Sequence, residues 1–130
     1  MSDLFWNFIY LSIAFQVKHL ICDYPLQNSY MLQKGKPFPH YILPLLTHAS
    51  VHGWGTYIIV GVFTRNLLIA ACFLMADIAC HFIVDRLKAS PSLGGRWKPD
   101  KPYFWWMLGL DQYLHHMWHL FIVGYLTWPC

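Results

Sequence analysis

The chain has 130 residues, of which 57% are hydrophobic, 18% aromatic and 12% charged, and its formal net charge is +3. Soluble domains carry about 25% charged residues, so this composition is typical of a membrane protein, and the length suits one domain. No helix face or tail is densely basic, and we therefore expect no nucleic-acid partner.

A membrane-spanning helix needs about 20 mostly apolar residues. Four stretches meet this length, with approximate ranges 4–26, 39–63, 66–88 and 103–128. A short turn around Arg65 joins the second stretch to the third, which predicts an antiparallel pair. The expected fold class is therefore all-α, an integral-membrane four-helix up-down bundle formed by residues 1–130 as a single domain. The first stretch lacks the basic start and cleavage site of a signal peptide, so we expect it to be retained.

Each stretch carries histidine or aspartate one helical turn apart. In chain order the motifs are His19-x3-Asp23, His48-x3-His52, Asp77-x3-His81-x3-Asp85 and Asp111-x3-His115-x3-His119. Side chains four residues apart lie on one helix face, about 6 Å apart along the axis. Ionisable groups are costly inside membrane helices, so they mark a functional site by default. A single pair could be a hydrogen bond between packed helices, whereas four pairs favour a joint site.

In an up-down bundle all four motifs fall in the same half of the helices, which predicts layers. The shallow layer holds Asp23, His48, Asp85 and Asp111. The next layer holds His19, His52, His81 and His115. The deepest layer holds Asp77 and His119, and Gln27 lies at the mouth.

Basic residues predict which side the site faces. The loops on the motif side and the helix ends beside them carry Lys34, Lys36, Arg86, Lys88, Arg96, Lys98 and Lys101. The opposite side has only Arg65 in its turn, and excess Lys and Arg mark the cytoplasmic face. We expect a multi-pass protein of the inner (cytoplasmic) membrane, with its site facing the cytoplasm and both termini outside. Lys18 lies about 100° around the helix from His19, and we expect it to extend along the helix toward the membrane surface.

Imidazole and carboxylate together suit divalent transition metals such as Zn, Mn or Fe, and the donors are too many for one tetrahedral ion. Two ions are therefore expected. Their expected ligands are His19, Asp23, His48, His52, His81, Asp85, Asp111 and His115. Asp85, Asp111 and Asp23 are the expected catalytic carboxylates, which bridge the ions or act as general base. The residues expected to support the ligands are Gln27, Asp77 and His119, and Asp77 would accept a hydrogen bond from His81.

The basic loop over residues 89–102 lies at the expected mouth of the site. The residues expected to attract an anionic small molecule or a lipid head group are Arg86, Lys88, Arg96 and Lys98. The pair Gly94-Gly95 is read first as a flexible connector, and the alternative is a close backbone approach to a phosphate.

Four strings carry a resemblance to a known family: His19-Leu-Ile-Cys-Asp23-Tyr-Pro-Leu-Gln27, His48-Ala-Ser-Val-His52-Gly53, His81-Phe-Ile-Val-Asp85-Arg-Leu-Lys88 and Leu110-Asp111-Gln112-Tyr-Leu-His115. Over nearly its whole length the chain resembles a small polytopic membrane family of bacteria and phages, catalogued as domain of unknown function 3307. This resemblance adds Gln112 to the expected supporting residues. Pro25 departs from the family pattern and predicts a kink in the first helix. A more distant similarity is to predicted membrane-bound metal-dependent hydrolases, which also set His and Asp in transmembrane helices.

Together these observations predict a metal-dependent hydrolase of the membrane that cleaves a phosphoester of a lipid-linked or nucleotide-like anion at the cytoplasmic face. The alternatives are a di-iron or haem redox protein, a proton or metal transporter, and a non-enzymatic phage-type effector with a structural metal. Almost wholly apolar outer helix halves favour a one-sided pocket over a conduit. Besides the lipid bilayer, a second copy of the chain and a host membrane protein are left open as partners.

Overall fold

The computed structural model describes residues 2–128. Its elements are α1 (Ser2–Asp23), η1 (Met31–Gly35), α2 (Ile42–Thr64), α3 (Leu67–Ala89), η2 (Gly94–Arg96) and α4 (Pro102–Thr127). The long helices begin and end within three residues of the predicted spans, and residues 2–128 contain no strand. The all-α class and the four helices are therefore confirmed.

Local chemistry sets the helix ends. Proline lacks an N–H and disfavours helical geometry in the residue before it, so Pro25 ends α1 at Asp23 instead of kinking a longer helix, and the predicted kink is wrong. At the other end of the bundle, Arg65 adopts a left-handed conformation with φ of 52°. Asn66 then caps α3, because its side chain accepts hydrogen bonds from the N–H groups of Leu68 and Ile69. The tight turn makes α2 and α3 antiparallel neighbours, as the sequence predicts.

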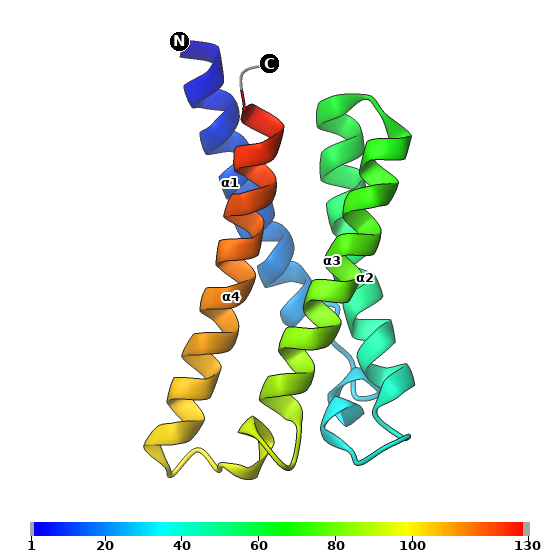
Figure 1. The fold of residues 1–130 in the computed structure, drawn as a ribbon, viewed down its shortest axis with the longest axis vertical. Helices are drawn as coiled ribbons and strands as arrows, with labels where there is room; N and C mark the ends of the chain where they lie inside the picture. Colours follow the sequence, from blue (N-terminus) through cyan, green and yellow to red (C-terminus); the bar gives the residue numbers. More distant parts are fainter. Residues whose placement is uncertain (1, 129–130) are drawn as a thin grey trace.

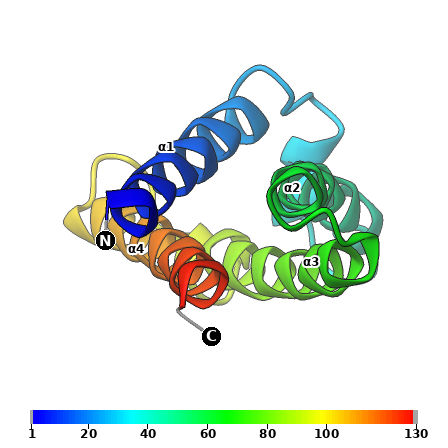
Figure 2. The same cartoon turned by 90° about the horizontal axis from the view of Figure 1, so that it is seen from above.

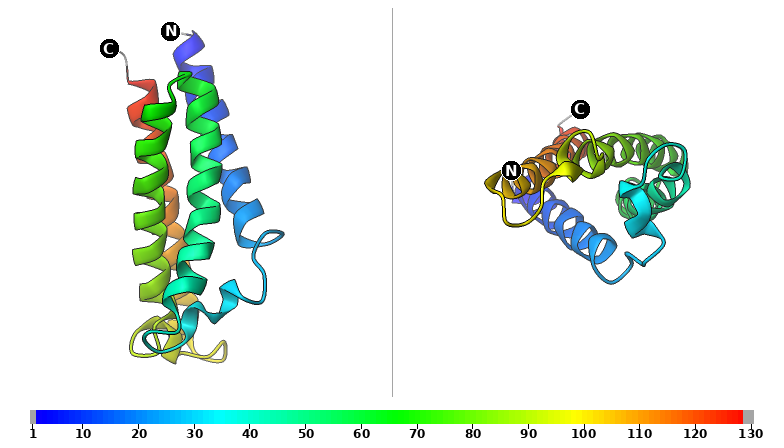
Figure 3. Two further views of the ribbon diagram at one scale, coloured as in Figure 1. Left: turned by 90° about the vertical axis from the view of Figure 1, so that its right-hand side faces the viewer. Right: turned by 90° about the horizontal axis from the view of Figure 1, so that it is seen from below.

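The helices run up and down, so that both chain ends lie at one end of the bundle and both long loops at the other (Figure 1). Neighbours contact in the cyclic order α1, α2, α3, α4, and the view along the bundle shows this ring (Figure 2). The loops that carry η1 and η2 lie together at the same end (Figure 3). The motif-bearing helix halves are therefore next to both loops.

Gly53 permits the close packing of α2 on α3. A Cβ atom at this position would lie 2.5 Å from Ile78 Cγ1 and 3.0 Å from the carbonyl oxygen of Leu74. No side chain fits that space without moving the α3 backbone, so a glycine is required where α2 crosses α3.

The interior divides into two zones. Toward the chain ends it is an apolar core of Leu11, Phe15, Val60, Ala70, Ile122 and Val123. Toward the loops a few buried side chains, such as Leu45 and Ala49, are apolar, but most are polar: Lys18, His19, His48, His52, Thr56, Asp77, His81, Asp85, Asp111, His115 and His119. Protein interiors are usually apolar, so a buried polar cluster points to a special role. Here the cluster extends through one half of the bundle.

Two of the four predicted spans are long and apolar enough to cross a membrane, in the stretches Asp3–Asp23 and Leu67–Arg96. Only 22% and 17% of their most apolar windows are buried inside the protein. Among the described residues α2 and α4 do not reach the same limit, because their histidines and their tyrosine and tryptophan side chains lower the mean hydropathy.

Candidate metal centre

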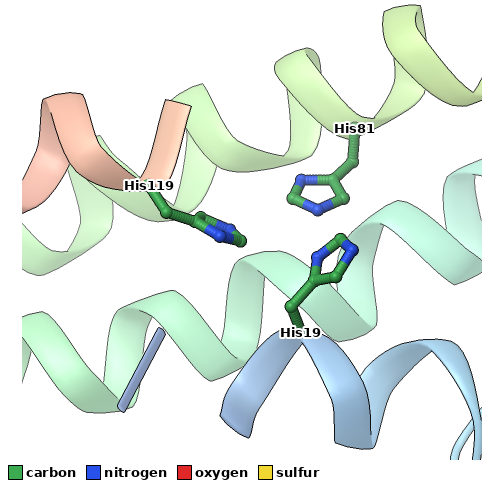
Figure 4. Close-up of side chains that lie close together, drawn as sticks. All are labelled: His19, His81 and His119. Atoms are coloured by element: carbon green, nitrogen blue, oxygen red, sulfur yellow. The ribbon is translucent and has the colours of Figure 1, made fainter. Parts of the chain in front are cut away.

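Four imidazole rings, one from each long helix, meet in the middle of the polar half. The ring of His81 stacks on His52 with centroids 4.0 Å apart and on His115 with centroids 4.3 Å apart. The ring of His19 completes the set, 5.1 Å from both His52 and His115. These four residues form the predicted middle layer. His119 joins from the deeper layer, and His19, His81 and His119 point toward one another from three helices (Figure 4).

The donors form three groups in which the potential ligand atoms lie within 4.8 Å of one another. The groups are His19 with His81 and His119, Asp23 with His48 and His52, and Asp85 with Asp111 and His115. His48 connects two of them, since its Nε2 lies 3.4 Å from Asp23 Oδ1 and 3.2 Å from Asp85 Oδ2. The eight predicted ligands thus lie in one continuous cluster.

Many of these donor atoms are buried without a hydrogen-bond partner. Within the described part of the chain, the imidazole nitrogens with neither a hydrogen bond nor an ion-pair contact include Nδ1 of His19, His48 and His52 and Nε2 of His81 and His115. An unsatisfied buried polar atom costs about 1–3 kcal/mol, so a cluster of them needs an explanation. Bound cations satisfy imidazole lone pairs and carboxylate oxygens at once, which makes the donor set fit divalent transition metals.

Asp77 orients His81. The Nδ1 of His81 lies 3.0 Å from the main-chain oxygen of Asp77 and 3.3 Å from its carboxylate Oδ1. Because a carbonyl can only accept, Nδ1 carries the proton, and the lone pair of the neutral ring is on Nε2, which faces the cluster. This is the hydrogen bond expected from the spacing of the two residues, and it is the usual way in which a ligating histidine is held.

Lys18 lies inside the bundle, and the prediction that it extends to the membrane surface is wrong. Its ammonium donates to Asp77 Oδ2 at 2.9 Å and to Thr56 Oγ1 at 3.1 Å, and it lies 3.3 Å from His119 Nε2. The ion pair with a buried carboxylate at the same depth stabilises the ammonium more than a position along the apolar helix surface would. Since an ammonium can only donate, Nε2 of His119 accepts, and a neutral ring then carries its proton on Nδ1.

Thr56 and Trp118 complete this deep network, and sequence reasoning missed both. The Thr56 hydroxyl donates to Asp77 Oδ2 at 2.7 Å, and the Trp118 indole N–H donates to Oδ1 at 2.7 Å. Both Asp77 oxygens are therefore satisfied. Lys18 and Asp77 are charged residues at equal depth in apolar helices, which is the one signal in the sequence that could have revealed the pair.

Two lysines at the mouth balance two of the predicted catalytic carboxylates. Lys88 Nζ donates to Asp111 Oδ2 at 2.9 Å, and Gln112 donates to the same oxygen at 3.0 Å. Lys34 Nζ, which was predicted only as a topology signal, lies 3.3 Å from Asp85 Oδ1. The cationic side chains thus lie directly beside the cluster.

The other basic residues expected to bind substrate have different surroundings. Arg86 donates to the main-chain oxygens of Lys34 and Lys36 and lies over the ring of Tyr41, 3.6 Å from its centroid. It therefore fastens the η1 loop to α3. Arg96 is exposed beside the ring of Trp97, and Lys98 is also exposed.

Gln27 and the pair Gly94-Gly95 have structural roles. Gln27 donates to the main-chain oxygen of Asp23 at 3.0 Å, so it helps to end α1. A Cβ atom on Gly94 would lie 2.5 Å from the Lys88 carbonyl oxygen, and one on Gly95 would clash with the carbonyl of Ala89. These glycines let η2 pack tightly against the end of α3, so the interpretation as a flexible connector is wrong.

The geometry defines an all-α bundle whose polar half holds a buried His/Asp cluster shared by four helices. The chain belongs to the family described as "Protein of unknown function (DUF3307)", whose model matches residues 11–129. That region includes every residue of the cluster. No curated protein and no solved structure matches the chain.

Proposed function

We propose that this protein is an integral-membrane, metal-dependent hydrolase that holds two divalent transition ions and cleaves a phosphoester of a lipid-linked or nucleotide-like anion. Zn, Mn and Fe are the ions that suit the mixed imidazole and carboxylate donors. One observation carries the proposal, namely the buried donor atoms from all four helices that lack hydrogen-bond partners among the described residues. The more distant similarity to membrane-bound hydrolases agrees with it but rests on analogy.

Each part of the cluster has a task in this chemistry. Two bound ions would supply hydroxide at neutral pH and stabilise the attacking and leaving oxygens of a displacement. Asp85 and Asp111 would take the proton from the attacking water, and their support is a position at the mouth beside the lysines. Lys88 and Lys34 would bind the anionic oxygens of the substrate. Asp77 holds His81 with its lone pair toward the cluster.

The proposed placement is a multi-pass arrangement in the inner membrane, with the cluster toward the cytoplasm and both termini outside. Its support is the low burial of the two apolar stretches, since a core helix of a soluble protein is mostly buried. The cluster end of the bundle also carries the basic loops, and excess Lys and Arg face the cytoplasm. A reporter fused to either terminus tests this, because a cytoplasmic terminus would contradict the orientation.

Elemental analysis of the purified protein tests whether the cluster binds metal ions, and how many. We expect about two transition ions per chain, and a large loss of metal in His81→Ala. His40→Ala is the matched control, since His40 is exposed and lies outside the cluster. A protein without stoichiometric metal, or equal metal in both variants, would overturn the proposal.

Asp111→Asn separates catalysis from structure. If Asp111 acts in the reaction, the variant stays folded and keeps metal but no longer hydrolyses a phosphomonoester substrate. If the metal only stabilises the fold of a non-enzymatic effector, loss of metal and loss of the folded state occur together, and the wild type shows no hydrolysis.

Two alternative functions, redox chemistry and transport, are distinguished from hydrolysis by different observations. The mixed donors also suit a di-iron redox site, and haem is a further redox option, so an absorption spectrum is decisive: a colourless, zinc-loaded protein excludes both. Transport needs a polar path through the bundle. Beyond the Lys18–Asp77 network the fully buried side chains of the described residues are apolar, among them Phe15 and Val60, which favours a site open at one end. Ion flux in proteoliposomes that His81→Ala abolishes would instead support transport.

A further inference from the structure

A cavity of about 300 Å³ lies between α3, η2 and α4, directly beside the His/Asp cluster. Its wall is mainly apolar, with Val84 and Leu87 from α3 and Met107, Leu110 and Leu114 from α4. Its polar lining residues are Lys88, Arg96 and Asp111. One end of the cavity is thus cationic and shares Asp111 with the cluster, while the rest is hydrocarbon-like.

This combination defines the chemistry of a ligand. Two cationic side chains against one carboxylate leave a local excess of positive charge, which complements a phosphate. The apolar walls gain about 0.8 kcal/mol for each methylene group that they bury. A nucleotide would need several hydrogen-bond partners for its base and ribose, and besides the three charged groups the lining side chains offer only the indole N–H of Trp97. The volume is at the small end of ligand cavities, which favours one chain over two.

We propose that this cavity binds a single-chain lipid phosphate, with its hydrocarbon chain along Leu87, Leu110 and Leu114 and its phosphate at Lys88 and Arg96. The inference rests on the proposed function in that it names the substrate class of the same site. The phosphate would lie beside Asp111, because Lys88 Nζ is 2.9 Å from its Oδ2. The chain enters from the lipid phase at the exposed sides of Leu87 and Leu110, which are 45% and 48% accessible.

Photo-crosslinking tests this on the protein as purified in nanodiscs. The probe is lysophosphatidate with a diazirine in its acyl chain, and mass spectrometry maps the labelled residues. We expect labelling concentrated on Leu87, Leu110 and Leu114. Unlabelled lysophosphatidate should compete at least about tenfold better than monoacylglycerol, inorganic phosphate or a nucleoside monophosphate, since only it satisfies both ends of the cavity.

Two variants with a matched control separate the cavity from the general lipid surface. Leu110→Trp fills the cavity and should lower labelling of Leu87 at least fivefold, whereas Leu120→Trp introduces the same side chain at a similarly exposed leucine of α4 outside the cavity and should not. Arg96→Gln, at an exposed position, should weaken competition by lysophosphatidate several-fold. If Leu110→Trp does not fold, the effect of Arg96→Gln on competition by lysophosphatidate tests the proposal instead.

The outcomes distinguish this inference from the proposed function, because metal content is measured on the same samples. Metal present with labelling spread evenly over all four helices overturns the cavity alone. Labelling confined to the cavity without bound metal overturns the hydrolase proposal and leaves a lipid-phosphate site. Equal competition by inorganic phosphate shows a site for the head group only, which also overturns the inference.

Discussion

Replacing Lys18 by methionine keeps the length and apolar stem of the side chain but removes the ammonium that faces Asp77. The two side chains are 5% and 0% exposed, so solvent does little to screen the pair. Removing one partner of a buried ion pair costs about 3–5 kcal/mol, because the other charge remains buried and unpaired. Asp77 keeps its hydrogen bonds from Thr56 and Trp118, which places the expected loss of unfolding free energy near the lower end, about 3 kcal/mol.

Equilibrium unfolding in mixed micelles, followed by tryptophan fluorescence, measures this loss. The expected value is a large share of the roughly 5–15 kcal/mol that stabilises a typical domain. The double variant Lys18→Met/Asp77→Asn should recover at least about 1 kcal/mol of it, since removing both charges relieves the unpaired carboxylate. Lys36→Met is the control, because the Lys36 side chain is exposed and donates to Gln33 at the surface, and it should change stability by less than about 0.5 kcal/mol. A Lys18→Met effect as small as the control would refute the inward placement of the ammonium.

Further predictions concern packing, capping and pH. Gly53→Ala should destabilise the bundle by about 1–3 kcal/mol in the same assay, because its Cβ meets the Leu74 carbonyl and Ile78, whereas Gly124→Ala has open space around it and should be neutral or stabilising. Equal effects of the two would contradict the close helix contact. Asn66→Ala should lower the free energy of unfolding by about 1 kcal/mol, because α3 loses its N-terminal cap. Thermal unfolding measures this, and an unchanged midpoint would contradict the role of the cap. Metal content should fall as the pH drops through about 6, since ligating imidazoles must be neutral, and full retention at pH 5 would argue against histidine ligands.

The helices and the convergence of their motifs follow from the sequence alone because both depend on local rules. A spacing of four places two side chains on one helix face, and short loops fix the direction of each helix. His52 and His115 could therefore be assigned to one layer without coordinates. Likewise Asp77 could be paired with His81, since both lie on the same helix.

The features that sequence reasoning missed depend on contacts between elements. The direction of the Lys18 side chain is set by Asp77 and Thr56 on other helices, and a lysine stem is long enough to extend either way. The partners of Arg86 are main-chain oxygens of the η1 loop, which leave no trace in residue types. Gly94 is required by the backbone of α3, whose position only the folded chain defines.

The division of the interior into an apolar zone and a polar zone has a consequence for how the protein tolerates change. Near the chain ends, Leu11 or Ile122 needs only shape and hydrophobicity, so several aliphatic residues suit each position. Near the loops, His52 or Asp85 meets several donors and charges at once, and almost no other side chain offers the same atoms. A saturation mutagenesis map of the bundle should therefore show one permissive end and one nearly invariant end, with the border at the level of Lys18 and Asp77.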